Sequence, residues 1–566
     1  MRKPHLEAVQ ASCAIHLRIE PHLTRMTSHF FSRQPPRALN QQRPERESGP
    51  KLGPYLGIYL GLLAPALLHA QTATLGTTNL VEGSAAGVDA VLLNIPSSTN
   101  SWTATVNAPW LHLSAGSNQG VGTTHVLFGW DANPGGTRIG TLTVAGLTLT
   151  VTQVGSAYVP ASAVTLVSSG LNYPQGVGVD LAGNVYIADE RHSAIKKWSP
   201  VSDTLSTLIG SGLVNPQGLA VDAEGNVFFT DRGNNTVNEW AVATGIVTNL
   251  VSAGLNKPSG VALDPAGDLY IIQGPHDDLL KWSAGVLTTI ASSGLYFPNG
   301  IASDTFGNLY LSTTNNSILE LSVASGATNT LVETNLNAPA GIAVGGGGNL
   351  FFADSANGAI KTWNAFSHRV NTLVSGLGRP AGVAVDGKGN VFFADALNNR
   401  VAELPRAFVN PTPRFQAGNA GSDALPPVWP SAVIQSAIFG PISDSPSWLS
   451  ITGVTNGVIS YSFTANPSAI THRTGHLVVL GQKIPVTQLG RSSAPPITGE
   501  LIDGAVQVSF TGNPGASYSV LASTNVELPV SAWTLAGIAS EIAPGQFRFT
   551  NAPSSETSQF FQVRTP

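Results

Sequence analysis

The chain has 566 residues, of which 42% are hydrophobic and 11% are charged, and it contains 60 glycines and 38 prolines. This length exceeds a single domain, so several hydrophobic cores are expected. Abundant glycine and proline without a long amphipathic helical pattern favour many short strands joined by tight turns.

The first 70 residues differ in composition from the rest. They hold nine basic and four acidic residues and end in the apolar run YLGIYLGLLAPALLHA, Tyr55 to Ala70. A basic region, an apolar segment and a small final residue predict a leader with a secretory signal over residues 1–70, and Met26 or some later codon is an alternative start. A retained membrane helix is the alternative, which the short run and Pro65 disfavour. We therefore expect a bacterial protein that is secreted, periplasmic or on the cell surface, with no stable membrane span after cleavage.

Cleavage after Ala70 would leave 19 basic and 29 acidic residues, a net charge of about −10. Cys13, Met1 and Met26 all lie in the leader, so the mature chain would have no cysteine and no methionine. This excludes a disulfide framework, a thiol nucleophile and a cysteine metal site. It fits export to an oxidising exterior, and compositional drift explains it equally well.

Residues 71–157 alternate apolar and polar positions, as expected for an immunoglobulin-like β-sandwich. Residues 409–491 share parts of that sequence. The matched positions are Trp110 and Trp448, Trp130 and Phe463, Asn133-Pro134 and Asn466-Pro467, Arg138 and Arg473, and Gln153 and Gln488. These residues resemble BACON domains, a family named for a suspected carbohydrate-binding role in bacterial surface and secreted proteins.

The BACON resemblance implies that exposed aromatic side chains could stack on sugar rings, and the candidates are Trp102, Trp110 and Trp448. The alternative is that a Trp before an apolar strand packs the core of the sandwich. Members of the family often act as spacers, so the resemblance leaves sugar binding open.

Between the two sandwiches, residues 162–408 contain a repeat of about 41 residues. Its Pro-x-Gly prolines are Pro174, Pro216, Pro258, Pro298, Pro339 and Pro380. Each unit continues with an apolar strand, a hairpin at Gly-Asn or Gly-Asp, a second apolar strand and two further strands. Near-continuous apolar runs indicate strands buried on both faces. Four antiparallel strands per unit at this period predict a six-bladed β-propeller.

The strand count also predicts how the propeller closes. The sixth unit stops at RVAELPRA (Arg400 to Ala407) without a fourth strand, while AVTLVSSGL (Ala163 to Leu171) precedes the first unit without a partner. We therefore expect the early strand to complete the sixth blade, which would remove two open sheet edges.

The units resemble NHL repeats through Pro-x-Gly, the Val-Asp strand end, Gly-Asn and the Asp after the second strand. That Asp is present in four units and is replaced by Gln273 and Thr313 in the third and fourth. The four are Asp189, Asp231, Asp354 and Asp395. An architectural role is expected for it, with Asp231 hydrogen-bonding the neighbouring loop. The His that gives the NHL family its name is absent from the Asn398-Asn399-Arg400 loop.

Two loops that follow second strands hold the candidates for a metal site. They are DERH and HDD, which supply Asp189, His192, His276, Asp277 and Asp278. A catalytic metal site normally needs three converging ligands, and calcium or another divalent ion on carboxylate-rich loops is the least demanding form. The alternative is that these are solvated polar loops, with no metal or cofactor. Streptogramin lyases and peptidyl-amide lyases have similar repeats, but neither catalytic set matches this chain residue by residue.

The tail, residues 497–566, resembles the small β-sandwich at the C-termini of large secreted proteins from Verrucomicrobia and related bacteria. Its expected core residues are Tyr518, Trp533, Phe547 and Phe561.

Two functions remain from the sequence. The first is an exported, non-catalytic binding or scaffold protein whose propeller face and sandwiches engage a protein, peptide or glycan partner. The second is a metal-dependent lyase or hydrolase acting at the propeller mouth. Nucleic acid is not an expected partner, because residues 163–408 carry 12 basic against 19 acidic residues.

Overall fold

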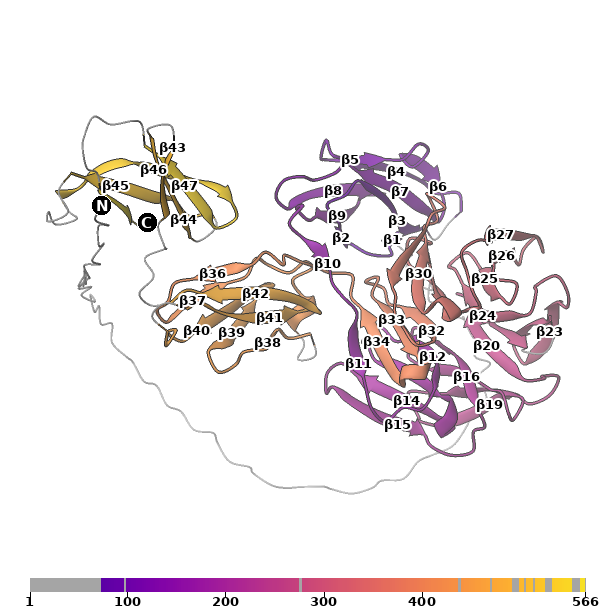
Figure 1. The fold of residues 1–566 in the computed structure, drawn as a ribbon. Coiled ribbons are helices and arrows are strands. Elements are labelled where there is room, and N and C mark those ends of the chain that lie inside the picture. Colours follow the sequence, from indigo (N-terminus) through magenta and orange to yellow (C-terminus); the bar gives the residue numbers. More distant parts are fainter. Residues whose placement is uncertain are drawn as a thin grey trace, which may run out of the picture. The chain divides into compact units, whose positions relative to one another are not determined.

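The computed structural model describes residues 73–95, 98–273, 277–435, 439–468, 471–490, 498–502, 505–512, 515–524, 532–551 and 560–564. The regular elements of these ranges are β-strands and short 3₁₀ helices (Figure 1). The predicted leader lies outside them. No helix of the described part is long and apolar enough to cross a membrane.

Six four-stranded antiparallel sheets form a β-propeller, as predicted. The first strand of each repeat begins at the Pro-x-Gly proline and contacts its counterparts in the blades before and after it, around a closed ring. The first three blades are β12–β15 (Pro174–Val179, Val185–Asp189, Ala194–Ser199, Thr204–Ile209), β16–β19 (Pro216–Val221, Val227–Asp231, Thr236–Trp240, Val247–Val251) and β20–β23 (Pro258–Leu263, Leu269–Gln273, Leu279–Ser283, Val286–Ala291). The others are β24–β27 (Pro298–Ser303, Asn308–Thr313, Ile318–Ser322, Thr328–Val332), β28–β31 (Pro339–Val344, Leu350–Asp354, Ala359–Trp363, Val370–Val374) and β32–β34 (Pro380–Val385, Val391–Asp395, Arg400–Leu404) with β11 (Val164–Val167).

The expected closure of the sixth blade is confirmed. Strand β11 pairs antiparallel with β34, with Val164 opposite Glu403 and Thr165 opposite Ala402. Just outside the blade, β10 (Val159–Pro160) pairs with β35 (Phe408–Val409), so the chain segments that enter and leave the propeller are joined to each other. The two ends of the ring are therefore held by main-chain hydrogen bonds and not by side-chain packing alone.

The glycine of Pro-x-Gly is required by the close approach of adjacent innermost strands. A Cβ atom added at Gly300 would lie 2.3 Å from the Ala340 carbonyl oxygen in the next blade, and one at Gly382 would lie 2.3 Å from the Gln175 carbonyl oxygen. Real Cβ atoms essentially never come that close. The motif thus lets six innermost strands meet around one axis.

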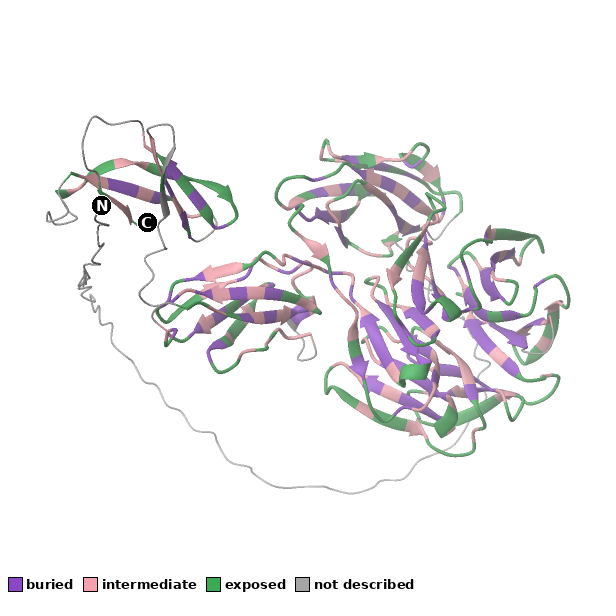
Figure 2. Ribbon diagram, in the orientation of Figure 1, coloured by how far each residue is buried: buried purple, intermediate pink, exposed green. Residues whose placement is uncertain are grey.

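Burial falls from the centre of each blade toward its outer edge (Figure 2). The second strands β13, β17, β21 and β33 are buried at every position, as their continuous apolar runs predicted. The fourth strands are largely exposed or partly exposed, as in β15 and β23. Short 3₁₀ turns follow three of the second strands: η1 (Glu190–His192), η2 (Ser355–Asn357) and η3 (Ala396–Asn398).

Two further parts of the chain each consist of two sheets that enclose one core. The first unit contains β1–β9: Thr74–Leu75, Asn79–Glu82, Gly87–Asn94, Ser101–Val106, Leu111–Leu113, Gln119–Val121, Thr124–Trp130, Arg138–Val144 and Leu147–Gln153. The second unit contains β36–β42: Arg414–Gln416, Gly421–Ala424, Ile442–Ser443, Leu449–Thr455, Val458–Phe463, Arg473–Val479 and Gln482–Gln488, with η4 (Val433–Gln435).

The C-terminal strands form one six-stranded sheet in the order β43-β44-β47-β46-β45-β48. Tyr518 and Phe547 are buried in its core and Phe561 packs against them, whereas Trp533 is partly exposed and outside that cluster. Its strands are Thr498–Ile502, Ala505–Thr511, Tyr518–Ser523, Thr534–Ala543, Gln546–Thr550 and Phe560–Arg564.

The closing strand provides a stability test. Leu166 of β11 is buried in the same cluster as Phe392 and Val401 of the sixth blade. Replacing it with Ala leaves a cavity where the ring closes, and we expect the unfolding free energy to fall by about 3 kcal/mol. Thermal unfolding followed by circular dichroism measures this. The neighbouring exposed Thr165→Ala is the matched control, and equal melting temperatures for the two variants would contradict the closure.

Candidate binding site at the centre of the propeller

The candidate metal residue Asp189 is part of a loop-holding network. Its side chain is fully buried, and its carboxylate accepts hydrogen bonds from the Asn172 backbone N–H at 2.7 Å and from His192 Nδ1 at 2.7 Å. The ammonium group of Lys196 lies 2.6 Å from the same carboxylate. Through these three contacts Asp189 and His192 hold the loops of their own blade in place.

The carboxylates of the third blade are also engaged. Asp277 accepts hydrogen bonds from the backbone N–H groups of Leu295 at 2.9 Å and Phe297 at 2.8 Å, and Asp278 accepts one from the Gln273 amide at 3.4 Å. His276 lies outside the described residues. In the described ranges no group of three or more His, Cys, Asp or Glu could hold a metal ion. The described candidate residues therefore do not supply the set of metal ligands that a metal-dependent lyase or hydrolase needs.

The repeated Asp after the second strand is architectural, as predicted. Asp231 accepts a hydrogen bond from the Val214 backbone N–H at 2.9 Å and another from Asn234 Nδ2 at 2.7 Å, which fixes the loops on both sides of the blade. Gln273 replaces it in the third blade and accepts the equivalent bond from the Asn256 backbone N–H. Glutamine tolerates this position because the role needs a hydrogen-bond acceptor and not a charge.

A second set of side chains links each blade to the next. Asn399, in the left-handed conformation at φ 51°, accepts a hydrogen bond from the Tyr173 backbone N–H at 2.7 Å, and so joins the sixth blade to the first. Asn235 and Asn316 make the same 2.7 Å bond to Lys257 and Ala338. Each link fixes the residue that precedes the Pro-x-Gly proline, and these pre-proline residues surround one end of the central channel.

The Trp candidates for sugar stacking lie against the cores of the two-sheet units. Trp102 is 6% exposed and Trp448 9% exposed, and both belong to the hydrophobic clusters. Trp110 is partly buried, and the Arg138 guanidinium lies 4.5 Å from the centre of its ring. Arg473 covers Trp448 in the same way at 4.4 Å. These positions agree with the core-packing alternative, because the rings offer little free surface to a sugar.

The motifs shared by the two units form one hydrogen-bond network that recurs in both. Arg138 Nε donates to Gln153 Oε1 at 2.8 Å, and Arg473 Nε donates to Gln488 Oε1 at 2.9 Å. The Gln amide then donates to backbone carbonyls of the loop that joins the two sheets, and to the carbonyl of the residue just after a strand of the opposite sheet, in each unit. The residues that the two units share in sequence thus have one structural role, which is to hold the two sheets of each unit together.

A cavity of about 450 Å³ lies where the innermost strands begin, and we call it the Pro-x-Gly mouth. All six blades line it with equivalent residues in successive layers. The outer layer is the residue between proline and glycine: Gln175, Gln217, Ser259, Asn299, Ala340 and Ala381. Below the six glycines an apolar belt forms the floor: Val177, Leu219, Val261, Ile301, Ile342 and Val383. The volume of the cavity is within the range of about 300–1,000 Å³ that is typical of ligand pockets.

The polar part of the outer layer is confined to the first four blades. The side-chain amides of Gln175 and Gln217 have no hydrogen-bond partner among the described residues, while Asn299 Nδ2 donates to the Pro339 carbonyl at 3.2 Å. The sequence holds the signal for this layer, since it is the variable position of an otherwise regular motif. We did not predict it because periodicity alone does not show which strand positions face the channel.

The other end of the innermost strands opens on a second cavity of about 640 Å³ with an acidic lining. Asp222, Asp264 and Asp304 directly follow three innermost strands there, and Glu224 adds a fourth carboxylate. His125 of the first two-sheet unit also lines this cavity, so that unit covers part of this end. Burial lowers the pKa of His125 against the opposing effect of Asp304.

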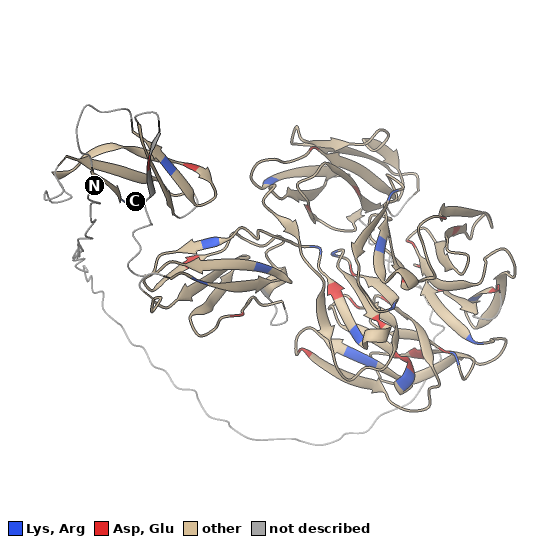
Figure 3. Cartoon of the chain, in the orientation of Figure 1, with Lys and Arg blue, Asp and Glu red and all other residues tan. Residues whose placement is uncertain are grey.

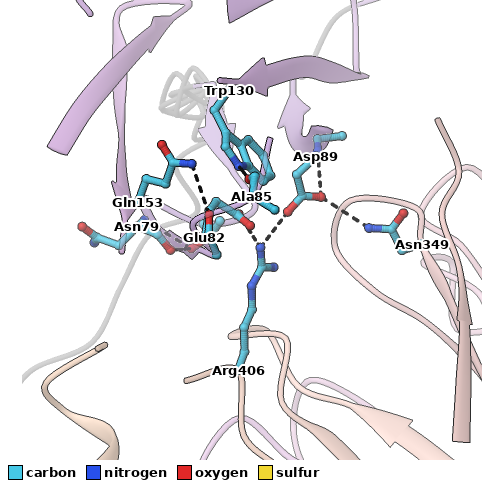
Figure 4. Close-up of polar contacts among 11 residues, drawn as sticks. Asn79, Glu82, Ala85, Asp89, Trp130, Gln153, Asn349 and Arg406 are labelled. Atoms are coloured by element: carbon cyan, nitrogen blue, oxygen red, sulfur yellow. Dashed lines mark hydrogen bonds and ion pairs between the residues drawn. The ribbon is translucent and has the colours of Figure 1, made fainter. Parts of the chain in front are cut away.

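The fifth blade departs from the repeat where it meets the first two-sheet unit (Figure 4). In the second blade Asn226 donates to Asp222 at 2.8 Å, but the fifth blade has Gly345 in place of that Asp. Its Asn349 donates to Asp89 of the first unit instead, at 3.3 Å. A Cβ at Gly347 would lie 2.9 Å from the Ala90 carbonyl oxygen, so the GGGG hairpin also makes room for the unit.

Arg406, just after the sixth blade, completes this junction. Its guanidinium lies 2.5 Å from the Glu82 carboxylate and 2.8 Å from the Asp89 carboxylate, and both acids are buried. One guanidinium group thus forms ion pairs with two carboxylates. Burial, with the nearby Asp89, raises the pKa of Glu82 to about 8.

No family model matches this chain, and no curated protein is similar to it. Among solved structures it is similar to a streptogramin B lyase at 17% identity and a TM-score of 0.36, over 44% of this chain and 97% of that chain. A gluconolactonase from Xanthomonas campestris is 19% identical at a TM-score of 0.38, over 43% and 89% of the two chains. A nidogen/laminin complex chain is 21% identical at 0.36, over 40% and 88%. Because the identities and scores are this low, the names do not identify what this chain binds.

Two buried acids, Glu82 at this junction and Glu403 in β34, make stability depend on pH. Glu82 and Glu403 both have a pKa of about 8 when folded, against 4.5 for the ordinary side chain. Between these values the folded chain holds protons that the unfolded chain releases, so stability falls as pH rises through this window. Glu82→Gln imitates the protonated side chain, and we expect the slope to shrink by at most about 1.4 kcal/mol per pH unit.

Melting temperatures between pH 5 and 9 measure that slope. The exposed Glu333→Gln is the control for loss of one acidic side chain, and it should leave the slope unchanged. A Glu82→Gln slope equal to that of the native chain would refute the raised pKa.

Proposed function

We propose that this chain is an exported binding protein whose propeller receives a polar ligand, part of a protein, peptide or glycan partner, at the Pro-x-Gly mouth. The observation that carries the proposal is the polar outer layer of that cavity. Gln175 and Gln217 present amide groups without hydrogen-bond partners among the described residues, whereas the neighbouring buried aspartates are engaged by their loops. An amide offers both donors and acceptors, so these side chains suit a ligand rich in polar groups.

The opposite end of the channel is less suited to a partner. The first two-sheet unit contributes His125 to that cavity and is fixed to the propeller by Arg406 and Asn349. A macromolecular partner therefore meets less obstruction at the Pro-x-Gly mouth.

We further infer that the repeats are of the NHL type and that both two-sheet units are BACON-like modules. The NHL assignment is supported by the recurring Pro-x-Gly, Gly-Asn and Asp positions and by the acceptor role of the Asp. The BACON assignment is supported by the shared Trp, Arg and Gln network. Because that network ties sheets together, the units serve this proposal best as spacers that present the propeller outside the cell.

The proposal is tested by ligand screening followed by substitution at the mouth. The purified chain without residues 1–70 is screened on a glycan array and a peptide display library, and the affinity of each hit is measured by titration calorimetry. The double variant Gln175→Ala, Gln217→Ala should weaken binding about tenfold or more, since the lost hydrogen bonds are made inside a partly dehydrated cavity.

The control is Asn249→Ala, which removes an exposed amide from the fourth strand of the second blade. It should bind as the native chain does. If the hits bind both variants with native affinity, or no ligand is found, the mouth is not the binding site.

A further inference from the structure

Unpaired cations gather around the Pro-x-Gly mouth. Five of the 12 basic residues between positions 163 and 408 form ion pairs with carboxylates: Lys196, Lys281, Lys361, Arg400 and Arg406. Four of the remaining seven belong to the pre-proline positions or to the loops after second strands, at the mouth end of the strands. They are Arg191, Arg232, Lys257 and Arg379, and none has an ion-pair partner among the described residues.

These four cations form an arc, because blades six, one, two and three contribute one each. Arg232 and Arg379 line the cavity itself. The Tyr173 side chain organises two of them: the Arg191 guanidinium lies 4.2 Å from its ring centre, and Arg379 donates to its hydroxyl at 2.6 Å. The acids at this end, apart from the buried aspartates, are Glu190, which also lines the cavity, Asp277 and Asp278. Figure 3 shows charged positions scattered over a mostly uncharged ribbon, and the three other cations without an ion-pair partner among the described residues are Lys197, Arg369 and Lys388.

The arc coincides with the polar wall of the cavity. Blades one, two and three supply both a cation and one of Gln175, Gln217 and Ser259. Next to this wall, on the fourth blade, Tyr296 and Phe297 are 52% and 50% exposed, although aromatic side chains of this size are usually buried. This end of the channel thus carries guanidinium groups and amides that line the cavity, and two exposed aromatic side chains outside that lining.

We propose that the Pro-x-Gly mouth binds the end of an acidic oligosaccharide, a sugar chain that carries uronic-acid carboxylates. Guanidinium groups bind carboxylates through paired hydrogen bonds. Side-chain amides match hydroxyl groups, which both donate and accept. Exposed aromatic faces pack against the apolar face of a sugar ring. The apolar belt closes the cavity below, so a chain end enters and a chain middle does not.

Other anionic partners fit these features less well. Nucleic acid requires a broad basic face, but the propeller carries seven more acidic than basic residues. An acidic peptide would satisfy the cations, yet peptide recognition depends largely on strand pairing or on apolar side-chain pockets. The amide side chains of the wall can form more hydrogen bonds with the closely spaced hydroxyl groups of a sugar than with a peptide.

This inference rests on the proposed function and names its ligand class. The probes are trigalacturonic acid, its full methyl ester, the neutral trisaccharide maltotriose, a hexaglutamate peptide and an RNA hexamer, each titrated calorimetrically. We expect the free acid to bind at least about tenfold more tightly than its ester, because esterification removes the charge and keeps the hydroxyl groups. Trimers of mannuronate and guluronate cover the other common uronic acids.

Two sets of variants separate charge recognition from the cavity itself. Arg232→Gln with Arg379→Gln should weaken acid binding about tenfold or more and leave ester binding unchanged. Arg379→Lys should retain part of the affinity, since it keeps the charge and loses the paired geometry. Arg369→Gln removes one exposed positive charge, half of what the double variant loses, from the hairpin before β31 and should have no effect.

The outcomes distinguish this inference from the proposed function. If maltotriose, the ester, the peptide or the RNA binds better than every uronate, and Gln175→Ala with Gln217→Ala weakens that binding, the ligand class is wrong and the binding mouth stands. If no probe binds and the array and library also yield no mouth-dependent ligand, both are overturned. Circular dichroism of each variant confirms that its fold is retained.

Discussion

The propeller depends on one constraint: six innermost strands must approach each other closely enough to share an axis. Glycine at the third position of Pro-x-Gly meets that constraint, because a side chain at Gly300 or Gly382 would collide with the carbonyl group of the next blade. The same crowding decides what the channel presents. With glycine in the middle layer, the residue before it faces the mouth and the residue after it forms the apolar floor. A single structural requirement therefore creates a variable polar layer above a fixed apolar one.

The periodicity of the sequence predicted the blades and the strand that closes them, since both follow from local rules of turns and strand pairing. The hydrogen-bonding role of Asp231 was predictable for the same reason, and its replacement by Gln273 is explained by the acceptor it retains. The contents of the mouth were not predictable in this way. Gln175 and Gln217 are ordinary polar residues in the sequence, and their meaning comes from six blades placing one motif position around one axis.

The contact between the first two-sheet unit and the fifth blade shows a different limit of sequence reasoning. The run Gly345 to Gly348 has the composition of a hairpin, and it does form one. What the sequence does not show is that the missing Asp leaves Asn349 without its usual partner, and that Asp89, 260 positions earlier, supplies the replacement. A departure from the repeat points to a new contact here, because the regular blades show which contact the residue at each position normally makes.

The two ends of the channel differ in charge for a physical reason that bears on function. The acids at the hairpin end cap turns, so Asp222 and Asp304 recur because the fold needs them. Among the described residues no side-chain hydrogen bond or ion pair holds Arg232 or Lys257 at the other end, since the bond from Lys257 to Asn235 is made by its backbone N–H, and the Arg379 side chain bonds Tyr173 alone. Long cationic side chains lose entropy when they are ordered, and an acidic protein gains little from grouping them. Charges that the fold does not use are the groups that the proposed anionic partner would bind at the rim of the mouth.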